Sequence, residues 1–373
     1  MRNTLEEQRP INVKIPSTRY LGSKRKILNW IWTNISKLPF DSFLDVFCGT
    51  SVVSFKAKLH GKQVYANDIL KFNYYVALSI IENSNRKLTR KDLELILSNH
   101  PDISYPTFIQ DTFKGIFYTD EENAWLDRVI TNIETFIDDK YKKALAYTIL
   151  GQACLVKRPF NLFHRRNLYM RLANIKRSFG NKKTWDTPFE THFKRFAKEY
   201  NEVIFDNGRE NKAFNQDALK LNFPGMENID LVYMDPPYLP KVGDKPDYHL
   251  FYHFLEGIVD YKNWPEKINH KSSIKVIKYS PSPWTSKATI YKAFNHLFRK
   301  FRHNKYLVLS YNTDGVPSLE ELYSMLKQYK DFVVVKKKKH QYVLSTNKPE
   351  ELLFITLDEN PAKYCLTSDY PKK

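Results

Sequence analysis

A nine-residue stretch, Asp230-Leu-Val-Tyr-Met-Asp-Pro-Pro-Tyr238, joins a short apolar run to an abrupt stop. The run from Asp230 to Met234 is apolar, with β-branched and aromatic residues, and it predicts a buried strand. Two consecutive prolines follow. Because proline has no N–H to donate and a fixed φ, the chain must leave the sheet there. Residues 235–238 are therefore expected at the carboxyl end of a strand, which is the edge where open α/β sheets bind ligands.

The four residues at this strand end suit the activation of an exocyclic amino group on a nucleobase. The lone pair of such a nitrogen is delocalised into the ring, so the nitrogen is a poor nucleophile. Asp235 can accept one amino hydrogen and the carbonyl of Pro236 can accept the other, which frees the lone pair for attack. Tyr238 can stack on the base. The alternative is a turn that only ends a strand, which Pro236-Pro237 would also form.

Composition and charge indicate a folded protein with a polyanionic partner. The 373 residues are 42% apolar, and the formal net charge is +18. So large a positive charge suggests binding to nucleic acid. The three cysteines are widely spaced and form no disulfide or metal-ligand pattern, so no metal is expected and a cytoplasmic location fits. No signal peptide and no apolar run near the roughly 18 residues of a membrane span are visible, so no membrane association is expected.

A second strand–loop–helix pattern lies near the N-terminus. Residues 43–47 predict a buried strand, residues 48–51 a tight turn of small side chains, and residues 52–60 a helix. This order is typical of the first unit of a nucleotide-binding α/β sheet. The turn lacks the three glycines of a dinucleotide fingerprint, so the ligand need not contain a pyrophosphate. Asp45, directly before the turn, is placed to receive an ammonium group.

A further strand, residues 63–68, ends in an acid that suits hydrogen bonds to ribose hydroxyls. An amino-acid head at Asp45 and a ribose at Asp68 together describe S-adenosylmethionine. Asp217 precedes the Asp230–Tyr238 stretch. It is expected either to meet the adenine amino group of that cofactor or to cap a helix.

The first residues combine an arm with a loop that enters a helix. Residues 1–17 are expected to be extended. Ser17 to Lys24 contain a Gly-Ser loop with a lysine, followed by helical spacing over residues 25–32. Free N–H groups and a cation would converge there on an anion. An ordinary capped surface helix is the equal alternative.

The middle of the chain, from about residue 71 to residue 205, is mainly helical and ends in a basic segment. Between Lys157 and Lys198 there are twelve Lys or Arg residues against two acids. Aromatic and amide side chains are interleaved between Arg158 and Arg171, a mixture that suits contact with phosphates and bases. A solvated helix face is the alternative. The expected nucleic-acid contacts are Arg158, Asn161, His164, Arg165, Arg166 and Arg171.

The C-terminal third contributes further strands and a second basic field. A loop over the site is expected after Tyr238, and residues 248–257 predict an aromatic helix that belongs mostly to the core or lines the base pocket. Residues 262–305 hold eleven Lys or Arg residues against one acid. Residues 305–312, 332–344 and 351–357 predict strands, the last two as an antiparallel pair. The four lysines within the second of these are expected in a solvated turn or as the guard of a sheet edge.

Taken in order, these motifs resemble a known family, the DNA adenine methyltransferases that modify the exocyclic N6 amino group. The resemblance is to the group with Dam-type and many restriction-modification enzymes, and its motifs span most of the chain. The motifs are Tyr20-Leu-Gly-Ser-Lys24, Asp45-Val-Phe-Cys-Gly49, Asn67-Asp68 and Asp235-Pro-Pro-Tyr238. Ser51 departs from the pattern, because many relatives have a second glycine there and serine tolerates an unusual backbone angle less well.

The resemblance implies a fold and a division of the chain. The fold is a Rossmann-like, S-adenosylmethionine-dependent methyltransferase sheet of the α/β class, with a mainly helical inserted target-recognition domain. Residues 1–75 would form the cofactor-binding half and residues 76–205 the insert. Residues 206–373 would form the catalytic half, with a basic DNA-contacting segment at about 240–300.

The resemblance also implies roles for individual residues. Asp235 to Tyr238 would bind the target adenine, with Asp235 also close to the cofactor. The cofactor would contact Tyr20 and Lys24 at its methionine end, Asp68 at its ribose and Asp217 at its adenine. The other expected cofactor-binding residues lie at the first strand and its loop: Asp45, Phe47 and Gly49.

The expected activity is methylation of a flipped adenine in double-stranded DNA at a specific site, by a monomer, with a cognate restriction endonuclease as a possible partner. Methylation of an amino group in RNA or on cytosine, or a non-catalytic DNA-binding module, are the alternatives. Cytosine ring methylation normally uses a cysteine after a proline. None of Cys48, Cys154 and Cys365 follows one.

Overall fold

A seven-stranded sheet forms the centre of the computed structural model, which describes residues 20–173, 175, 182–242, 247–339 and 349–371. The strand order is β3-β2-β1-β4-β6-β9-β8, and only β9 runs antiparallel to the others. The strands are β1 (Ser42–Asp45), β2 (Gln63–Asn67), β3 (Lys212–Phe214), β4 (Leu231–Met234), β6 (Tyr306–Asn312), β8 (Phe332–Lys339) and β9 (Glu350–Leu357). A separate two-stranded ribbon pairs β5 (Leu239–Pro240) with β7 (Gly315–Val316).

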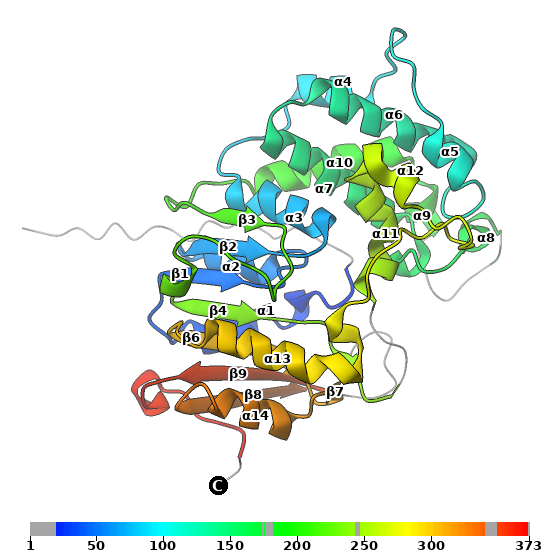
Figure 1. Ribbon diagram of the computed structural model, residues 1–373. Helices are drawn as coiled ribbons and strands as arrows, with labels where there is room; N and C mark the ends of the chain where they lie inside the picture. Colours follow the sequence, from blue (N-terminus) through cyan, green and yellow to red (C-terminus); the bar gives the residue numbers. More distant parts are fainter. Residues whose placement is uncertain (1–19, 174, 176–181, 243–246, 340–348, 372–373) are drawn as a thin grey trace, which may run out of the picture.

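Helices cover both faces of this sheet, as Figure 1 shows. The α-helices are α1 (Leu28–Ile35), α2 (Val52–Leu59), α3 (Lys71–Ala77), α4 (Arg90–Leu97), α5 (Phe108–Thr112), α6 (Asp120–Phe136), α7 (Lys140–Val156), α8 (Leu168–Leu172), α9 (Lys182–Asp186), α10 (Phe189–Glu202), α11 (Tyr248–Ile258), α12 (Trp264–Lys267), α13 (Lys287–Phe301) and α14 (Leu319–Lys327). No helix in the described ranges is long and apolar enough to cross a membrane.

The side chains of each strand alternate between two hydrophobic cores. Phe43 and Tyr233 belong to a core that includes α1, α2 and α3, whereas Leu44 and Val232 belong to a second core with α13 and α14. The alternation follows from the two-residue period of a strand. Strands buried on both faces read as continuous apolar runs, which is why the sequence predicts β1, β4 and β6 so directly. The protein is therefore a mixed α/β fold with a mostly parallel sheet.

The strand order reverses between β1 and β4, which pair in parallel with Asp45 opposite Tyr233. The chain moves outward from β1 through β2 to β3, then returns to β4 and continues on the other side to β6. Such a switch point leaves a crevice at the carboxyl ends of the two strands. The site is expected there.

Most of the helices inserted between β2 and β3 gather at one side of the sheet, and α11 and α12 join them from the later part of the chain (Figure 1). Phe254 of α11 and Trp264 of α12 pack in one aromatic cluster with Phe113 from the insert. Gly257 allows this approach, because a Cβ there would lie 1.9 Å from the Trp264 ring. The helical part thus extends beyond the contiguous stretch expected from the sequence.

The C-terminal strands confirm the expected antiparallel pair, β8 with β9. Lys336 to Lys339 lie within β8 at the edge of the sheet, so they guard an edge and form no turn. The first helix begins at Leu28, three residues later than expected. The N-terminal arm, residues 243–246 of the loop after Tyr238, and residues 340–344 of the expected strand lie outside the described residues.

Candidate active site

A cavity of about 720 Å³ opens at the carboxyl ends of β1, β2 and β4. Its wall includes the acids Asp45, Asp68, Asp217 and Asp235, which come from four separate parts of the sequence. The volume lies in the range of sites that enclose nucleotide-sized ligands. The switch point has therefore collected the residues that the sequence singled out for cofactor and base.

The turn after β1 is held in an unusual backbone conformation. Gly49 has φ +50° and Ser51 has φ +57°, so the serine occupies the left-handed region that favours glycine. The carboxylate of Asp68, at the end of β2, accepts the Gly49 N–H at 2.8 Å and the Leu70 N–H at 2.9 Å. Burial raises the pKa of Asp68 to about 6. Asp68 thus fixes the first loop as well as lining the cavity.

Asp45 is buried at the end of β1 with one oxygen unsatisfied. Its Oδ2 accepts the Ser54 hydroxyl at 2.6 Å, whereas Oδ1 is buried without a partner among the described residues. Burial raises the pKa of Asp45 to about 7, with Asp235 and Asp68 adding to the effect. Asp45 is one of the residues that line the cavity. A buried carboxylate is costly unless donors or a cation compensate it, and an ammonium group of a ligand could do so.

Tyr20 forms one wall of the cavity by stacking on α11. Its ring lies parallel to that of Tyr252 with centroids 4.2 Å apart, and its hydroxyl accepts the Asn73 amide at 2.8 Å. The Leu21 N–H donates to the Tyr252 hydroxyl at 2.8 Å. Tyr248, one turn earlier on α11, also lines the cavity. The aromatic helix therefore serves as core and as cavity wall together.

Lys24 and the residues after β4 form a buried charged group. The Lys24 ammonium lies 3.1 Å from Asp235 Oδ1 and 4.4 Å from the centre of the Tyr238 ring. Burial disfavours the ammonium, but the attraction of Asp235 and Glu351 outweighs it and raises the pKa of Lys24. Burial raises the pKa of Asp235 even though Lys24 opposes the shift. The cation expected at an anion-binding loop is thus already paired with a carboxylate.

The far end of the cavity is formed by Asp217, Phe47 and Trp284. Asp217 Oδ1 accepts the Leu219 N–H at 3.0 Å, so it closes a turn and caps no α-helix. Phe47 packs edge-on against Trp284 with centroids 5.2 Å apart. No motif distinguished Trp284 in the sequence; it reaches the cavity because the segment before α13 folds back.

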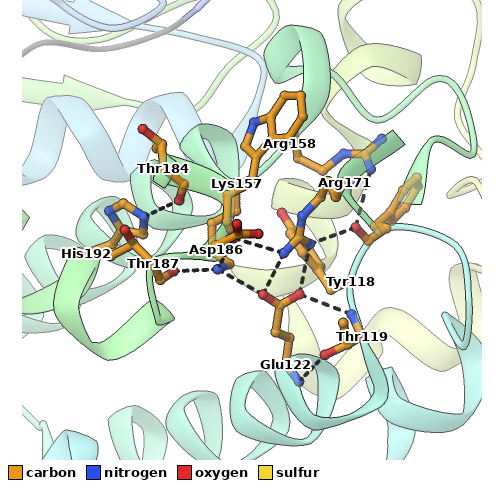
Figure 2. A network of polar contacts seen from close by, with 12 residues as sticks. Tyr118, Thr119, Glu122, Lys157, Arg158, Arg171, Thr184, Asp186, Thr187 and His192 are labelled. Carbon is orange, nitrogen blue, oxygen red and sulfur yellow. Dashed lines mark hydrogen bonds and ion pairs between the residues drawn. The ribbon is translucent and has the colours of Figure 1, made fainter. Parts of the chain in front are cut away.

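Two of the arginines expected to contact nucleic acid lie inside the helical part. Arg171 is 5% exposed and forms a bidentate pair with Glu122, at 2.6 and 2.8 Å, and Lys157 reaches the same carboxylate at 2.9 Å (Figure 2). Arg158 is 1% exposed and donates to the carbonyls of Leu162 and Arg165. The expectation that Arg158 and Arg171 contact nucleic acid at the surface is corrected by their burial. Both arginines instead form hydrogen bonds inside the helical part and stabilise the segment between them.

The remaining residues of this segment lie further out. Arg165 and Arg166 are exposed, and Asn161 and His164 are half-buried. Phe160 is 49% exposed, and both it and Asn161 have positive φ. The ring of His164 contacts Phe251 on α11, one turn from Tyr248 in the cavity wall. The exposed basic segment and the cavity are thus joined through one helix.

Glu351 and Ser310 are site residues that the sequence interpretation missed. Tyr238 has its hydroxyl 3.1 Å from Ser310 Oγ and 3.3 Å from Glu351 Oε2. Burial raises the pKa of Glu351 to about 7. The available signal was an acid next to the apolar run of residues 352–355 in β9.

An α/β sheet with acids at adjoining strand ends around one cavity is the arrangement in which such folds bind nucleoside-containing ligands. Residues 20–325 match the sequence model of a protein family, the D12 class N6 adenine-specific DNA methyltransferases. The chain therefore belongs to this family. It is an adenine-specific DNA methyltransferase that uses S-adenosylmethionine, as the resemblance in the motifs implied.

Named relatives support this placement. The chain is 32% identical over 357 residues to the type II methyltransferase M2.HphI of Haemophilus parahaemolyticus, covering 92% of this chain and 98% of that protein. It is 27% identical to the type II methyltransferase M.NlaIII of Neisseria lactamica, covering 85% and 90%. The match to M.FokI of Planomicrobium okeanokoites is 28% identical and covers 83% of this chain but 47% of that protein.

Proposed function

We propose that the cavity binds S-adenosylmethionine next to an adenine that has been turned out of duplex DNA. When bound, S-adenosylmethionine supplies the methyl group. The carboxylate of Asp45 would receive the ammonium group, Asp68 the ribose hydroxyls, and Asp217 the adenine amino group. Tyr20, Lys24, Phe47 and Gly49 would complete this part of the wall. The presence of Asp45, Asp68 and Asp217 around one cavity carries this assignment, because three carboxylates can accept from the ammonium, hydroxyl and amino groups of one ligand.

Asp235 and the carbonyl of Pro236 would each accept one hydrogen of the adenine amino group. The nitrogen then attacks the methyl carbon, the N6–carbon bond forms as the sulfur–carbon bond breaks, and the nitrogen releases one proton to solvent. Lys24 contacts Oδ1 of Asp235 at 3.1 Å and favours its carboxylate form against the effect of burial, and Asp235 lines the cavity. Pro237 keeps the turn rigid, and Tyr238 holds the base. The effects at work are positioning and electrostatics.

The helical part, residues 76–205 together with α11 and α12, would read the DNA sequence. Asn161, His164, Arg165 and Arg166 would contact the duplex, with Phe160 exposed beside them. Arg158 and Arg171 are proposed to hold this segment in place. Support comes from their burial, from the exposure of Arg165 and Arg166, and from the contact of His164 with the helix that lines the cavity. The basic field over residues 262–305 would add phosphate contacts.

We further propose that the enzyme acts as a monomer in the cytoplasm as the modification partner of a restriction endonuclease. The names of the relatives, all type II methyltransferases or modification methylases, favour this role.

Transfer of a radiolabelled methyl group tests the site assignment. Wild-type enzyme should label duplex DNA containing its site and leave RNA unlabelled. The Asp235→Ala variant should bind S-adenosylmethionine but lose transfer by about a hundredfold or more, because it has no side-chain acceptor for the amino hydrogen. Full activity of Asp235→Ala, or equal labelling of RNA, would refute the assignment.

A further inference from the structure

The acidic side chain of Glu351 is buried in β9, next to Tyr238 in the turn of residues 235–238. Glu351 is 1% exposed and is followed in the strand by apolar residues and one threonine. Burying a carboxylate is unfavourable unless hydrogen bonds or a counter-ion compensate it. The charge of Lys24 compensates part of this cost. The hydrogen bond of Glu351 goes to Tyr238, and this contact indicates a further role.

The register of the sheet brings Glu351 to the active-site side. Glu351 lies opposite Asn312 in the antiparallel pair of β6 and β9, and directly opposite residues point to the same face. Ser310 lies two residues before Asn312 and so shares this face. Asn312 itself lines the cavity. The Ser310 hydroxyl and the Glu351 carboxylate therefore both lie next to Tyr238, each on one of two neighbouring strands.

Tyr238 connects these two groups. The Tyr238 hydroxyl donates to Glu351 Oε2 at 3.3 Å, and Ser310 Oγ lies 3.1 Å from the hydroxyl oxygen of Tyr238. A phenol has one proton. If that proton goes to Glu351, the Ser310 hydroxyl must donate to Tyr238, which gives the direction Ser310 to Tyr238 to Glu351.

The ring of Tyr238 is held on other sides as well. The Lys24 ammonium lies over one face, and Tyr311 contacts the ring at 68° with centroids 4.8 Å apart. Tyr238 is therefore fixed by its hydroxyl, by one face and by an edge contact. Among the described residues that contact Tyr238 in this way, Glu351 is an acid that does not itself line the cavity.

We propose that Glu351 is a positioning residue for methyl transfer: it holds the hydroxyl of Tyr238 so that the ring is oriented before the target base enters. This inference rests on the proposed role of Tyr238 and adds a residue from a strand outside the catalytic motif. Glu351 touches neither base nor cofactor in this account. Its effect on turnover passes through the tyrosine.

Glu351→Leu tests the proposal, because leucine has a similar volume and accepts no hydrogen bond. The variant should lose some thermal stability, because the buried Lys24 ammonium keeps only Asp235 as its counter-ion, so kcat is compared at a temperature where both proteins are folded. Its kcat should fall by about tenfold or more, the worth of one hydrogen bond to a charged group. The KM for S-adenosylmethionine should stay unchanged. Glu350→Leu, the neighbouring acid on the opposite face of β9, is the matched control and should leave kcat unchanged.

Two further variants separate positioning from a general need for the residue. Glu351→Gln keeps an oxygen that accepts from Tyr238, so it should restore kcat to within about threefold of wild type. Tyr238→Phe should lose as much kcat as Glu351→Leu, and the double variant should lose no more than either single one. Additive losses in the double variant, or a Glu351→Gln variant as slow as Glu351→Leu, would overturn the proposal.

Failure of this inference is distinguishable from failure of the proposed site. If Tyr238→Ala removes activity while Glu351→Leu retains it, only the role of Glu351 is wrong. If Tyr238→Ala retains full activity, the proposed role of Tyr238 is wrong and the inference falls with it.

Discussion

Replacement of Lys24 by methionine tests the electrostatic design of the site. Lys24 lies between Asp235, 3.1 Å away, and the further carboxylate of Glu351. Methionine keeps much of the length of the side chain and removes the charge. Two buried carboxyl groups then remain without their cation.

The magnitude follows from the burial of the pair. The side chain of Lys24 is 6% exposed and that of Asp235 is 16% exposed, so solvent screens the pair weakly. Removing one partner of a buried pair costs about 3–5 kcal/mol of unfolding free energy. We expect the lower end, about 3 kcal/mol at pH 8, because the carboxyl group can protonate instead of remaining charged.

The loss of unfolding free energy in Lys24→Met should depend on pH. Burial already raises the pKa of Asp235, and Lys24 limits that rise. Without Lys24 the folded-state pKa moves further above the unfolded value. A carboxyl group with a raised pKa loses stability as pH increases through the interval between the two values. The destabilisation of the variant should therefore be largest at pH 8 and smallest near pH 5. The acid limb of its kcat profile should move to higher pH.

Urea unfolding at pH 5 and pH 8 measures this effect, with Lys26→Met as the control. Lys26 is exposed two residues away and should be replaceable with little change at either pH. If Lys24→Met and Lys26→Met unfolded at the same urea concentration at both values of pH, the buried-pair reasoning would be refuted.

Four other changes have defined outcomes. Calorimetry of wild type should show the affinity for S-adenosylhomocysteine rising as pH passes about 7, the pKa of Asp45, and Asp45→Asn should abolish that rise. Glu122→Ala should lower the free energy of unfolding in urea by about 3 kcal/mol, because two buried cations lose their counter-ion. Those cations lower the pKa of Glu122 against the effect of burial. The stabilisation that Glu122 gives wild type above about pH 4.5 should therefore fade as pH falls. Ser51→Gly should raise the unfolding free energy by about 1 kcal/mol by relieving a left-handed backbone angle; no change would show that the angle carries no strain. Arg165→Ala should reduce the slope of log affinity for DNA against log salt by about one, whereas Arg90→Ala, exposed on α4, should leave it unchanged.

The sequence predicted the centre of the fold well because the relevant signals are local. A parallel strand buried on both faces is a continuous apolar run, and two prolines end it without ambiguity. Asp45, Asp68 and Asp235 each follow such a run, so their strand ends could be located without a structure. Their meeting in one cavity followed from the rule for switch points in α/β sheets.

The errors share a different cause, since they concern tertiary partners that no local pattern encodes. Arg158 and Arg171 look like surface cations in a basic run, yet Glu122, far away in sequence, draws Arg171 inward, and backbone carbonyls bind Arg158. Glu351 looks like an ordinary strand acid until the register with β6 brings it beneath Tyr238. The packing of α11 and α12 against the helices of the insert also depends on long-range aromatic contacts, which no local pattern encodes; the division into domains stays a prediction.

Direct sequencing of modified bases in DNA from a host that expresses this chain would decide whether Asp235 takes part in adenine methylation. We expect N6-methyladenine at one recognition sequence in cells with the wild-type protein, and none at that sequence in cells with a folded Asp235→Ala variant. Unmodified adenine throughout the DNA of the wild-type cells, with the protein folded and present, would show that the enzyme does not methylate adenine there. Methylation that persists in the variant would show that Asp235 is not needed for it.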